Sequence, residues 1–189
     1  MAQVMPENAQ RPTMTFPVFA TTPSLTPDLA WQTLATVADP EIPVVSVTEL
    51  GIVRDVAVAG ERVQVVVTPT YSGCPATEMI NDEIRKALLA AGFAEVDVTI
   101  SLAPAWTSDW IGTEARAKLR QYGIVPPGHH HLDDAGGKVQ PLRFHRKNLA
   151  CPRCGSTDTE ELSAFGSTAC KALHRCKACK EPFEYFKPI

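Results

Sequence analysis

Two Cys-x2-Cys pairs near the carboxyl end of the chain constrain its fold more than any other feature. Cys151 and Cys154 form the first pair, Cys176 and Cys179 form the second, and 21 residues lie between the pairs. A tight turn of this kind can present two sulfurs to one ion, and four thiolates complete the tetrahedral shell that Zn²⁺ prefers. Because so short a module cannot bury much surface, we expect the metal to hold it together.

The predicted role of this metal is structural, because four protein ligands leave no open coordination position for a substrate. Cys170 lies six residues before Cys176 and outside both turns. Three interpretations stay open for it: a spare apolar residue, a replacement ligand, or a thiolate of an iron–sulfur cluster, which uses the same soft ligands. Zinc is the preferred metal, with an iron–sulfur cluster as the alternative.

A sixth cysteine, Cys74, stands in the segment TPTYSGCPATEMI, where a helical pattern begins. The start of a helix favours negative charge, so we expect this thiol to be biased toward the thiolate, which is both a nucleophile and a soft metal ligand. The alternative is a small buried apolar residue, since free cysteine is often buried. Gly73, which permits close backbone approach, and the hydroxyl groups of Thr70 and Ser72 favour a functional role.

The chemistry open to Cys74 is narrowed by the absence of a base. A cysteine hydrolase needs a general base, usually histidine, and residues 1–128 contain none. Metal handling and thiol exchange remain. Asp39 and Glu41 are the acids that we expect near Cys74, although their proline-rich loop is equally typical of a helix stop with an exposed acid.

The amino-terminal part of the sequence predicts a helix followed by a β-hairpin. Thr26 is an N-cap candidate followed by proline, and the helix is expected to run to about Ala38. Alternating valines on both sides of Gly60 then predict two paired strands.

The next segment adds a helix, a strand and a helix. Apolar residues at helical spacing predict a helix that ends near Gly92, and strict alternation predicts a strand over residues 96–102. A last helix should be capped by Thr107 or Ser108 and closed by Gly123. The predicted fold class is α+β: a two-layer α-β-β-α-β-α domain with a small mixed sheet, followed by a small zinc-ribbon-like β domain.

Composition divides the chain into four predicted segments. These are a flexible arm over residues 1–26, the α/β domain over 27–125, a linker over 126–142 and the ribbon over 143–189. The ribbon carries a net charge of +4 and the remainder −7, which permits an acidic partner such as nucleic acid without demanding one.

Neither a membrane span nor a secretory signal is indicated. No stretch approaches the ~18 consecutive apolar residues of a transmembrane helix, and the proline-rich start lacks a basic region followed by an apolar one. We therefore expect a cytoplasmic protein with no membrane partner. In that reducing setting cysteines are expected to bind metal or to react rather than to form disulfides.

Several motifs together resemble one known family. DPEIPVVSVTELGIV, TPTYSGCPATEMI, SLAPAWTSDWI, CPRCGS and FGSTACKALHRC are similar to the D component of the bacterial phenylacetyl-CoA epoxidase system, PaaD or PaaJ, over most of the chain from residue 28. The first two motifs are shared with a broader group of small iron–sulfur assembly domains, the SufT-like family. The tryptophan segment and the ribbon are more specific to the phenylacetate family.

The resemblance implies an accessory or maturation subunit of a multicomponent di-iron monooxygenase, which converts phenylacetyl-CoA to its ring epoxide in aerobic phenylacetate catabolism. Its partners would be the oxygenase and reductase components, whose iron or iron–sulfur centres it would help to assemble. The chain agrees with the implied lack of catalytic activity of its own, since it has no G-x-G-x-x-G turn and no pair of Glu-x-x-His motifs.

The resemblance also implies site residues by position. Around the reactive cysteine, or transient metal ligand, it places Cys74, Asp39, Glu41 and Thr70. In the ribbon it places Cys151, Cys154, Cys170, Cys176 and Cys179.

Three other functions stay open: a stable structural component of the epoxidase complex, a nucleic-acid-binding ribbon, and a thiol-redox enzyme. The last is disfavoured, because Cys74 has no Cys-x-x-Cys partner in its own domain. The oligomeric state, a homodimer included, does not follow from the sequence.

Overall fold

The computed structural model describes residues 24–128 and 149–189. The predicted arm, apart from its last three residues, and most of the predicted linker lie outside the described residues. The elements, in chain order, are α1 (Pro27–Leu34), β1 (Val53–Ala59), β2 (Arg62–Val67), α2 (Thr77–Ala90), β3 (Glu95–Ile100), the 3-10 helix η1 (Ser108–Trp110), α3 (Thr113–Tyr122), β4 (Ile124–Val125), β5 (Thr159–Ser163), β6 (Lys171–Cys176) and β7 (Pro182–Phe186).

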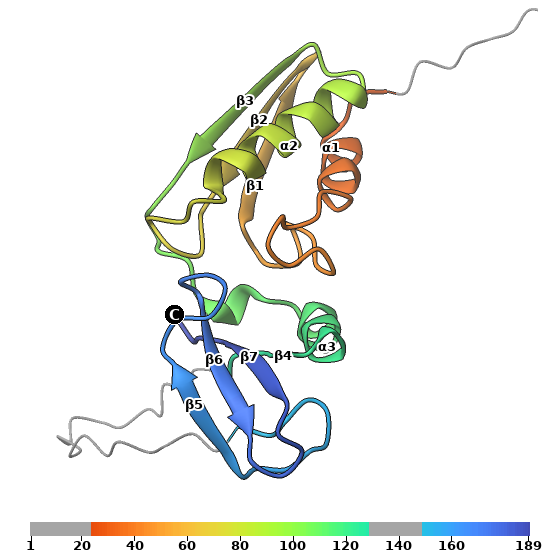
Figure 1. The fold of residues 1–189 in the computed structure, drawn as a ribbon. Helices are drawn as coiled ribbons and strands as arrows, with labels where there is room; N and C mark the ends of the chain where they lie inside the picture. Colours follow the sequence, from red (N-terminus) through yellow and green to blue (C-terminus); the bar gives the residue numbers. More distant parts are fainter. Residues whose placement is uncertain (1–23, 129–148) are drawn as a thin grey trace, which may run out of the picture.

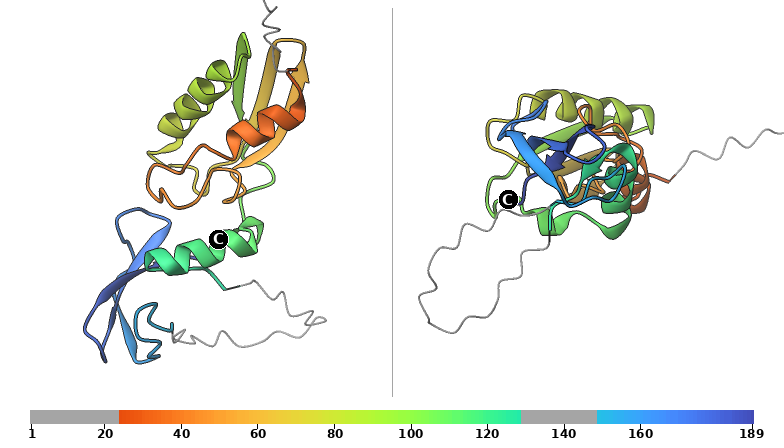
Figure 2. Two further views of the ribbon diagram at one scale, coloured as in Figure 1. Left: turned by 90° about the vertical axis from the view of Figure 1, so that its right-hand side faces the viewer. Right: turned by 60° about the horizontal axis from the view of Figure 1, so that its bottom comes forward.

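The first module is a three-stranded sheet covered by two helices. β1 and β2 form the predicted antiparallel hairpin, whose turn contains Gly60 at φ 62°. β3 then runs parallel to β2, and α2 supplies the crossover that a parallel pair requires. α2 covers one face of the sheet and α1 packs beside it, against α2 and β1 (Figures 1 and 2). The predicted mixed sheet and helical layer are confirmed.

Periodicity explains why this layer forms. Val63, Val65 and Val67 alternate along β2 and are almost fully buried. They belong to the same core as Ile84 and Leu88, which are four residues apart on one face of α2. Burying a side chain of this size contributes about 1.5–3 kcal/mol, so the two matched apolar faces account for the docking of helix on sheet.

The second module is a four-stranded sheet with the order β4-β7-β6-β5. β5, β6 and β7 are antiparallel neighbours, whereas β4 runs parallel to β7. β4 therefore belongs to this second sheet although it lies in the range predicted for the α/β domain, and α3 lies between the two sheets (Figures 1 and 2). The domain boundaries stay a prediction.

The two modules share one hydrophobic core. Phe186 from β7 and Cys170 from the loop before β6 belong to the same cluster of buried side chains as the valines of β2. The Phe186 ring lies 5.9 Å from the ring of Trp106, and the Trp106 indole N–H donates a 3.0 Å hydrogen bond to the carbonyl of Leu50. The backbone N–H of Ser108 also donates to the carbonyl of Ile189 at 3.1 Å.

Two predicted helices have different bounds in the structure. α1 ends at Leu34 rather than near Ala38, because the chain turns there and Ala38 forms a β-bridge with Ser46. The last predicted helix is divided in two: Thr107 caps only η1, and an extended Ile111 separates η1 from α3.

Among the described residues, no helix combines the length and the apolar character needed to cross a lipid bilayer.

We predict that Phe186→Ala lowers the free energy of unfolding by about 3–5 kcal/mol, because it empties the junction of the two modules. Phe165→Ala is the matched control, since this ring is 65% exposed and its loss should cost only about 0.5–1 kcal/mol. Chemical denaturation followed by tryptophan fluorescence measures both values. Equal effects of the two substitutions would show that the shared core does not stabilise the fold.

Candidate metal centre and thiol pocket

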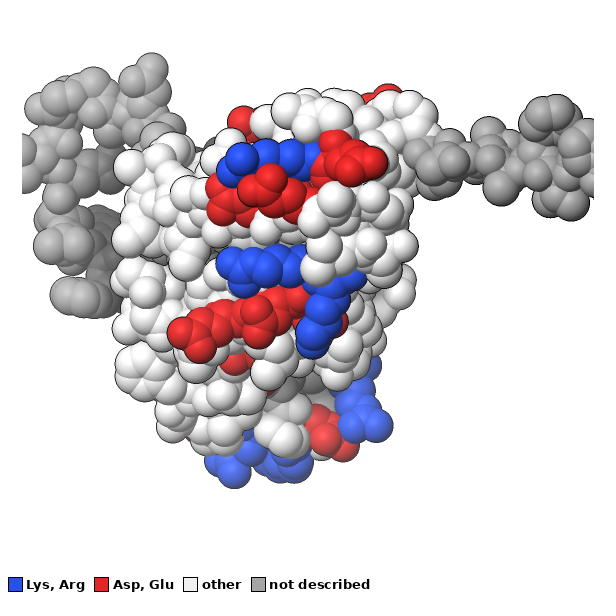
Figure 3. All heavy atoms as spheres, turned by 90° about the horizontal axis from the view of Figure 1, so that it is seen from above, with Lys and Arg blue, Asp and Glu red and all other residues white. Residues whose placement is uncertain are grey.

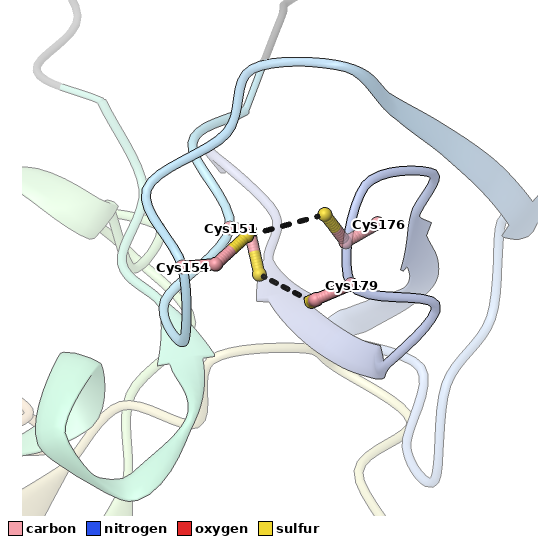
Figure 4. A group of neighbouring side chains, drawn as sticks. All are labelled: Cys151, Cys154, Cys176 and Cys179. Atoms are coloured by element: carbon pink, nitrogen blue, oxygen red, sulfur yellow. Dashed lines mark hydrogen bonds between the residues drawn. The ribbon is translucent and has the colours of Figure 1, made fainter.

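The four ribbon cysteines converge on one point in the second module. Their sulfurs all lie within 4.8 Å of one another, and the side chains point toward each other from the two turns (Figure 4). The distance from Cys151 Sγ to Cys179 Sγ is 3.8 Å, and that from Cys154 Sγ to Cys176 Sγ is 3.5 Å. All four cysteines are free of disulfides.

The two turns have the same backbone geometry. Gly155, at φ 75°, donates its N–H to the carbonyl of Cys151 at 2.9 Å, and Lys180, at φ 68°, donates to the carbonyl of Cys176 at 2.9 Å. Both residues follow a Cys-x2-Cys pair directly and adopt the left-handed conformation, which a lysine rarely takes. Each turn therefore aims its two sulfurs in the same way.

The donor set fits a zinc ion. Sulfurs about 2.3 Å from a central ion form a tetrahedron with edges of about 3.8 Å, which is close to both observed distances. Bound zinc would cross-link the two turns, and its complete sulfur shell would leave it without a position for substrate.

A second group of polar side chains lies where the two modules meet. Asp39, Glu41, Thr70, Cys74 and Cys170 all line a small cavity of about 20 Å³. The apolar part of its wall is formed by Ile42, Leu50, Ile52, Pro69, Ile80 and Phe186. The structure thus brings together the four residues predicted around the reactive cysteine.

Cys170 lies in the ribbon segment, as the resemblance implies, but outside its cluster of four sulfurs. It lines the Cys74 cavity instead. The loop between β5 and β6, which contains it, reaches toward the first module (Figure 1). Its position outside both Cys-x2-Cys turns was the only signal in the sequence.

Local hydrogen bonds hold the acidic side of the cavity. One oxygen of Asp39, Oδ1, accepts from the backbone N–H groups of Glu41 at 2.9 Å and of Ile42 at 2.8 Å. The Asp39 N–H in turn donates to the carbonyl of Val45 at 2.9 Å. Asp39 is 7% exposed, so these bonds fix a buried carboxyl group rather than the exposed one that a simple helix stop would leave.

Cys74 occupies a turn just before α2. Its N–H donates to the carbonyl of Tyr71 at 3.0 Å, and its own carbonyl accepts from Thr77, the first helical residue, at 3.2 Å. The side chain is half-buried and packs against the shared core.

The expected thiolate bias of Cys74 is wrong for the metal-free protein. Burial raises the pKa of this thiol, and the nearby carboxylates of Glu41 and Asp39 raise it further, whereas the N–H of Ala76 opposes them. Cys74 lies three residues ahead of the first helical residue, and the helix dipole acts mainly within the first turn. Desolvation and acidic neighbours therefore outweigh it.

The other titratable groups that line the cavity also have raised pKa values. Burial is the main cause that raises the pKa of Asp39 and that of Glu41, and it also raises the pKa of Cys170. A buried cation partly offsets this, because Lys171 lowers the pKa of all three groups. Lys171 itself is paired with Glu184 at 2.9 Å.

The comparison with known proteins identifies the family. The carboxyl-terminal residues 136–187 match the model described as PaaD zinc beta ribbon domain. A protein of Escherichia coli (strain K12), named as a component of 1,2-phenylacetyl-CoA epoxidase, is 49% identical over 84% of this chain and 91% of its own length. The chain belongs to the PaaD family. Residues 29–102 also match the model of an iron–sulfur cluster assembly protein, which agrees with the resemblance of the first module.

Two further proteins are similar to part of this PaaD family member. An Fe-S protein maturation auxiliary factor of Porphyromonas gingivalis is 36% identical over 46% of this chain and 83% of its own length. The crystal structure of a domain of unknown function, DUF59, from Bacillus anthracis has a TM-score of 0.45 and 27% identity, and covers 49% of this chain and 89% of that one.

We predict that the anaerobically purified protein contains one structural zinc ion per chain and no visible absorption band, because zinc has no partly filled d shell. Elemental analysis with an absorption spectrum measures this. Cys176→Ser should lose the zinc and unfold the second module, whereas Cys170→Ser, the same change in the same segment, should retain it. Iron and sulfide in the purified protein would contradict the prediction.

Proposed function

We propose that this protein is an accessory maturation factor of the multicomponent phenylacetyl-CoA epoxidase of aerobic phenylacetate catabolism. It assists the assembly of an iron or iron–sulfur centre in the oxygenase or reductase subunits, which are its partners. The similarity to a protein named as a component of this epoxidase supports the system, and the match to an iron–sulfur cluster assembly protein supports the role.

The observation that carries the proposal is the cavity around Cys74. It combines a thiol with the carboxyl groups of Asp39 and Glu41, and these are donor types that bind iron. None of the described residues that line the cavity is a histidine, so a histidine-assisted acyl transfer finds no base there. In this role Cys74 binds the metal cargo, the two carboxyl groups supply oxygen donors, and the surrounding apolar side chains exclude water.

The ribbon has a separate role in this proposal. Its metal would cross-link the two Cys-x2-Cys turns of the module that places Phe186 and Cys170 at the junction. Zinc there stabilises the second module and takes no part in the transfer of cargo.

The surface charges support a nucleic-acid-binding function less well than the cavity supports the maturation role. Seen from above, Lys and Arg alternate in rows with Asp and Glu (Figure 3). The exposed ion pairs of the first module include Arg62 with Glu95, Arg85 with Asp82, and Lys86 with Glu83. Binding to a phosphate backbone favours a continuous basic face, which this side of the molecule does not offer.

A stable structural component of the epoxidase complex is the second candidate function. An open groove of about 580 Å³ next to the cavity is lined by exposed apolar side chains, including Tyr71, Leu102 and Phe165. Grouped exposed apolar residues are typical of protein–protein interfaces. Gel filtration with the purified epoxidase components separates the two functions, because a maturation factor should not co-elute in stoichiometric amount.

We predict that Cys74→Ser abolishes maturation of the epoxidase while leaving this protein folded. A strain that lacks its own copy is complemented with the wild-type gene or the variant, and phenylacetyl-CoA epoxidase activity is measured in extracts. The variant should lose activity because a serine hydroxyl is a poor ligand for soft metals. Thr99→Ser, at an exposed position on β3 that lines neither the cavity nor the groove, is the control and should complement fully. Undiminished activity with Cys74→Ser would refute the proposed function.

A further inference from the structure

Two thiols from distant parts of the sequence line the same small cavity. Cys74 precedes α2 in the first module, and Cys170 precedes β6 in the second. Cys170 is only 8% exposed and lies within the shared core, while Cys74 packs against that core. The second thiol was not part of the role proposed for Cys74 above, and no ribbon sulfur lines this cavity.

Cys170 is held in place by contacts at the junction and not by the ribbon cluster. Its carbonyl accepts a 2.9 Å hydrogen bond from the N–H of Lys187, and its sulfur lies 3.0 Å from the hydroxyl of Thr168. The next residue, Lys171, is anchored to Glu184, whose other oxygen accepts from the N–H of Ser167 at 2.8 Å. This thiol therefore has a fixed and partly polar environment, which an apolar filler would not need.

The carboxyl groups around the cavity outnumber the cation that acts on them, which favours binding of a further cation. Asp39, Glu41 and Glu184 bring three carboxyl groups to the junction, and Lys171 is the cation that acts on them. Lys171 forms its ion pair with Glu184, and within the described residues Asp39 and Glu41 have no ion-pair partner of their own. Buried charges are normally paired or bind metal, so a divalent cation is the matching ligand.

The size of the cavity selects a single ion rather than a cluster. A water-sized sphere needs roughly 10–15 Å³ of such space, and the cavity has about 20 Å³. The cavity has room for one metal ion, whereas an iron–sulfur cluster with several heavy atoms would require the two modules to separate. Pro69, Thr70 and Cys170 line both this cavity and the open groove beside it, so an ion has a route from solvent.

We infer that Cys170 is the second sulfur ligand of the Cys74 site, which takes one thiophilic divalent metal ion of the Fe²⁺ class between the two modules. Asp39 or Glu41 supplies an oxygen ligand. On binding, each thiol releases its proton to solvent and forms one metal–sulfur bond, with no change of oxidation state. The inference rests on the proposed function and narrows its cargo to a single ion.

The site should bind more weakly than the ribbon does. Within the described parts of the chain, only the four ribbon cysteines bring three or more ligand atoms within 4.8 Å of one another. The ligands of the Cys74 site must therefore move together when the ion binds, which lowers its affinity. An exchangeable ion suits a protein that passes its cargo on.

Cobalt titration of the zinc-loaded, reduced protein tests the inference. Wild type should bind one additional Co²⁺ with thiolate-to-cobalt charge-transfer absorption, and a mild chelator should remove this ion while the zinc stays bound. Cys74→Ser and Cys170→Ser should each weaken binding at least about tenfold, because even indirect partners of a metal contribute that much. Each variant should also lose about half of the charge-transfer intensity. Ala169→Ser, next to Cys170, is the control and should bind like wild type.

Two results would overturn the inference: no additional cobalt in wild type, or a Cys170→Ser variant with wild-type affinity and spectrum. If Cys170→Ser fails to retain its zinc, the wild-type protein decides the question through a bifunctional thiol reagent. Mass spectrometry should then find Cys74 linked to Cys170, and bound Co²⁺ should block the link. Absence of the link would equally overturn the inference.

The cobalt titration and the complementation experiment test different claims, so one can fail while the other holds. If Cys74→Ser fails in cells while Cys170→Ser binds cobalt like wild type, the maturation role stands and the two-thiol site falls. If both thiols bind cobalt but Cys74→Ser cells keep full epoxidase activity, the two-thiol site stands and the maturation role falls.

Discussion

The packing of the carboxyl-terminal strand into the core of the first module is the contact on which the rest of the structure depends. Phe186 is almost fully buried beside Trp106, whose indole N–H is satisfied by the carbonyl of Leu50. This contact brings the loop before β6 to the thiol of Cys74. Without it, the cavity would lack one of its walls.

The cysteines of this protein illustrate how surroundings determine the chemistry of one side chain. Four of them lie in two similar turns and face each other at distances that suit a tetrahedral ion. Cys74 and Cys170 instead lie among carboxyl groups and apolar side chains, where burial raises the pKa of each thiol. The first arrangement favours a tightly bound structural metal ion, and the second favours an exchangeable metal ion.

The ion pair of the buried Lys171 with the partly buried Glu184 adds a polar element to this junction. Removing two such charges from water is costly, so a buried ion pair is weak evidence for stability. Its position is more informative: Lys171 follows Cys170 directly and also acts on Asp39 and Glu41. The pair therefore links the orientation of the second module to the acidic loop of the first.

The sequence by itself determined the parts that depend on neighbouring residues. The spacing of the two Cys-x2-Cys turns predicted the metal cluster, and alternating valines predicted the hairpin, because both patterns act over a few residues. The proximity of Asp39 to Cys74 was expected, and the family resemblance supported it, but no local pattern determined it. Tertiary structure alone decided that Cys170 belongs to the Cys74 cavity, since this depends on how two separate cores merge. It also decided that the pKa of the Cys74 thiol is raised rather than lowered, because desolvation is set by packing and cannot be inferred from local sequence.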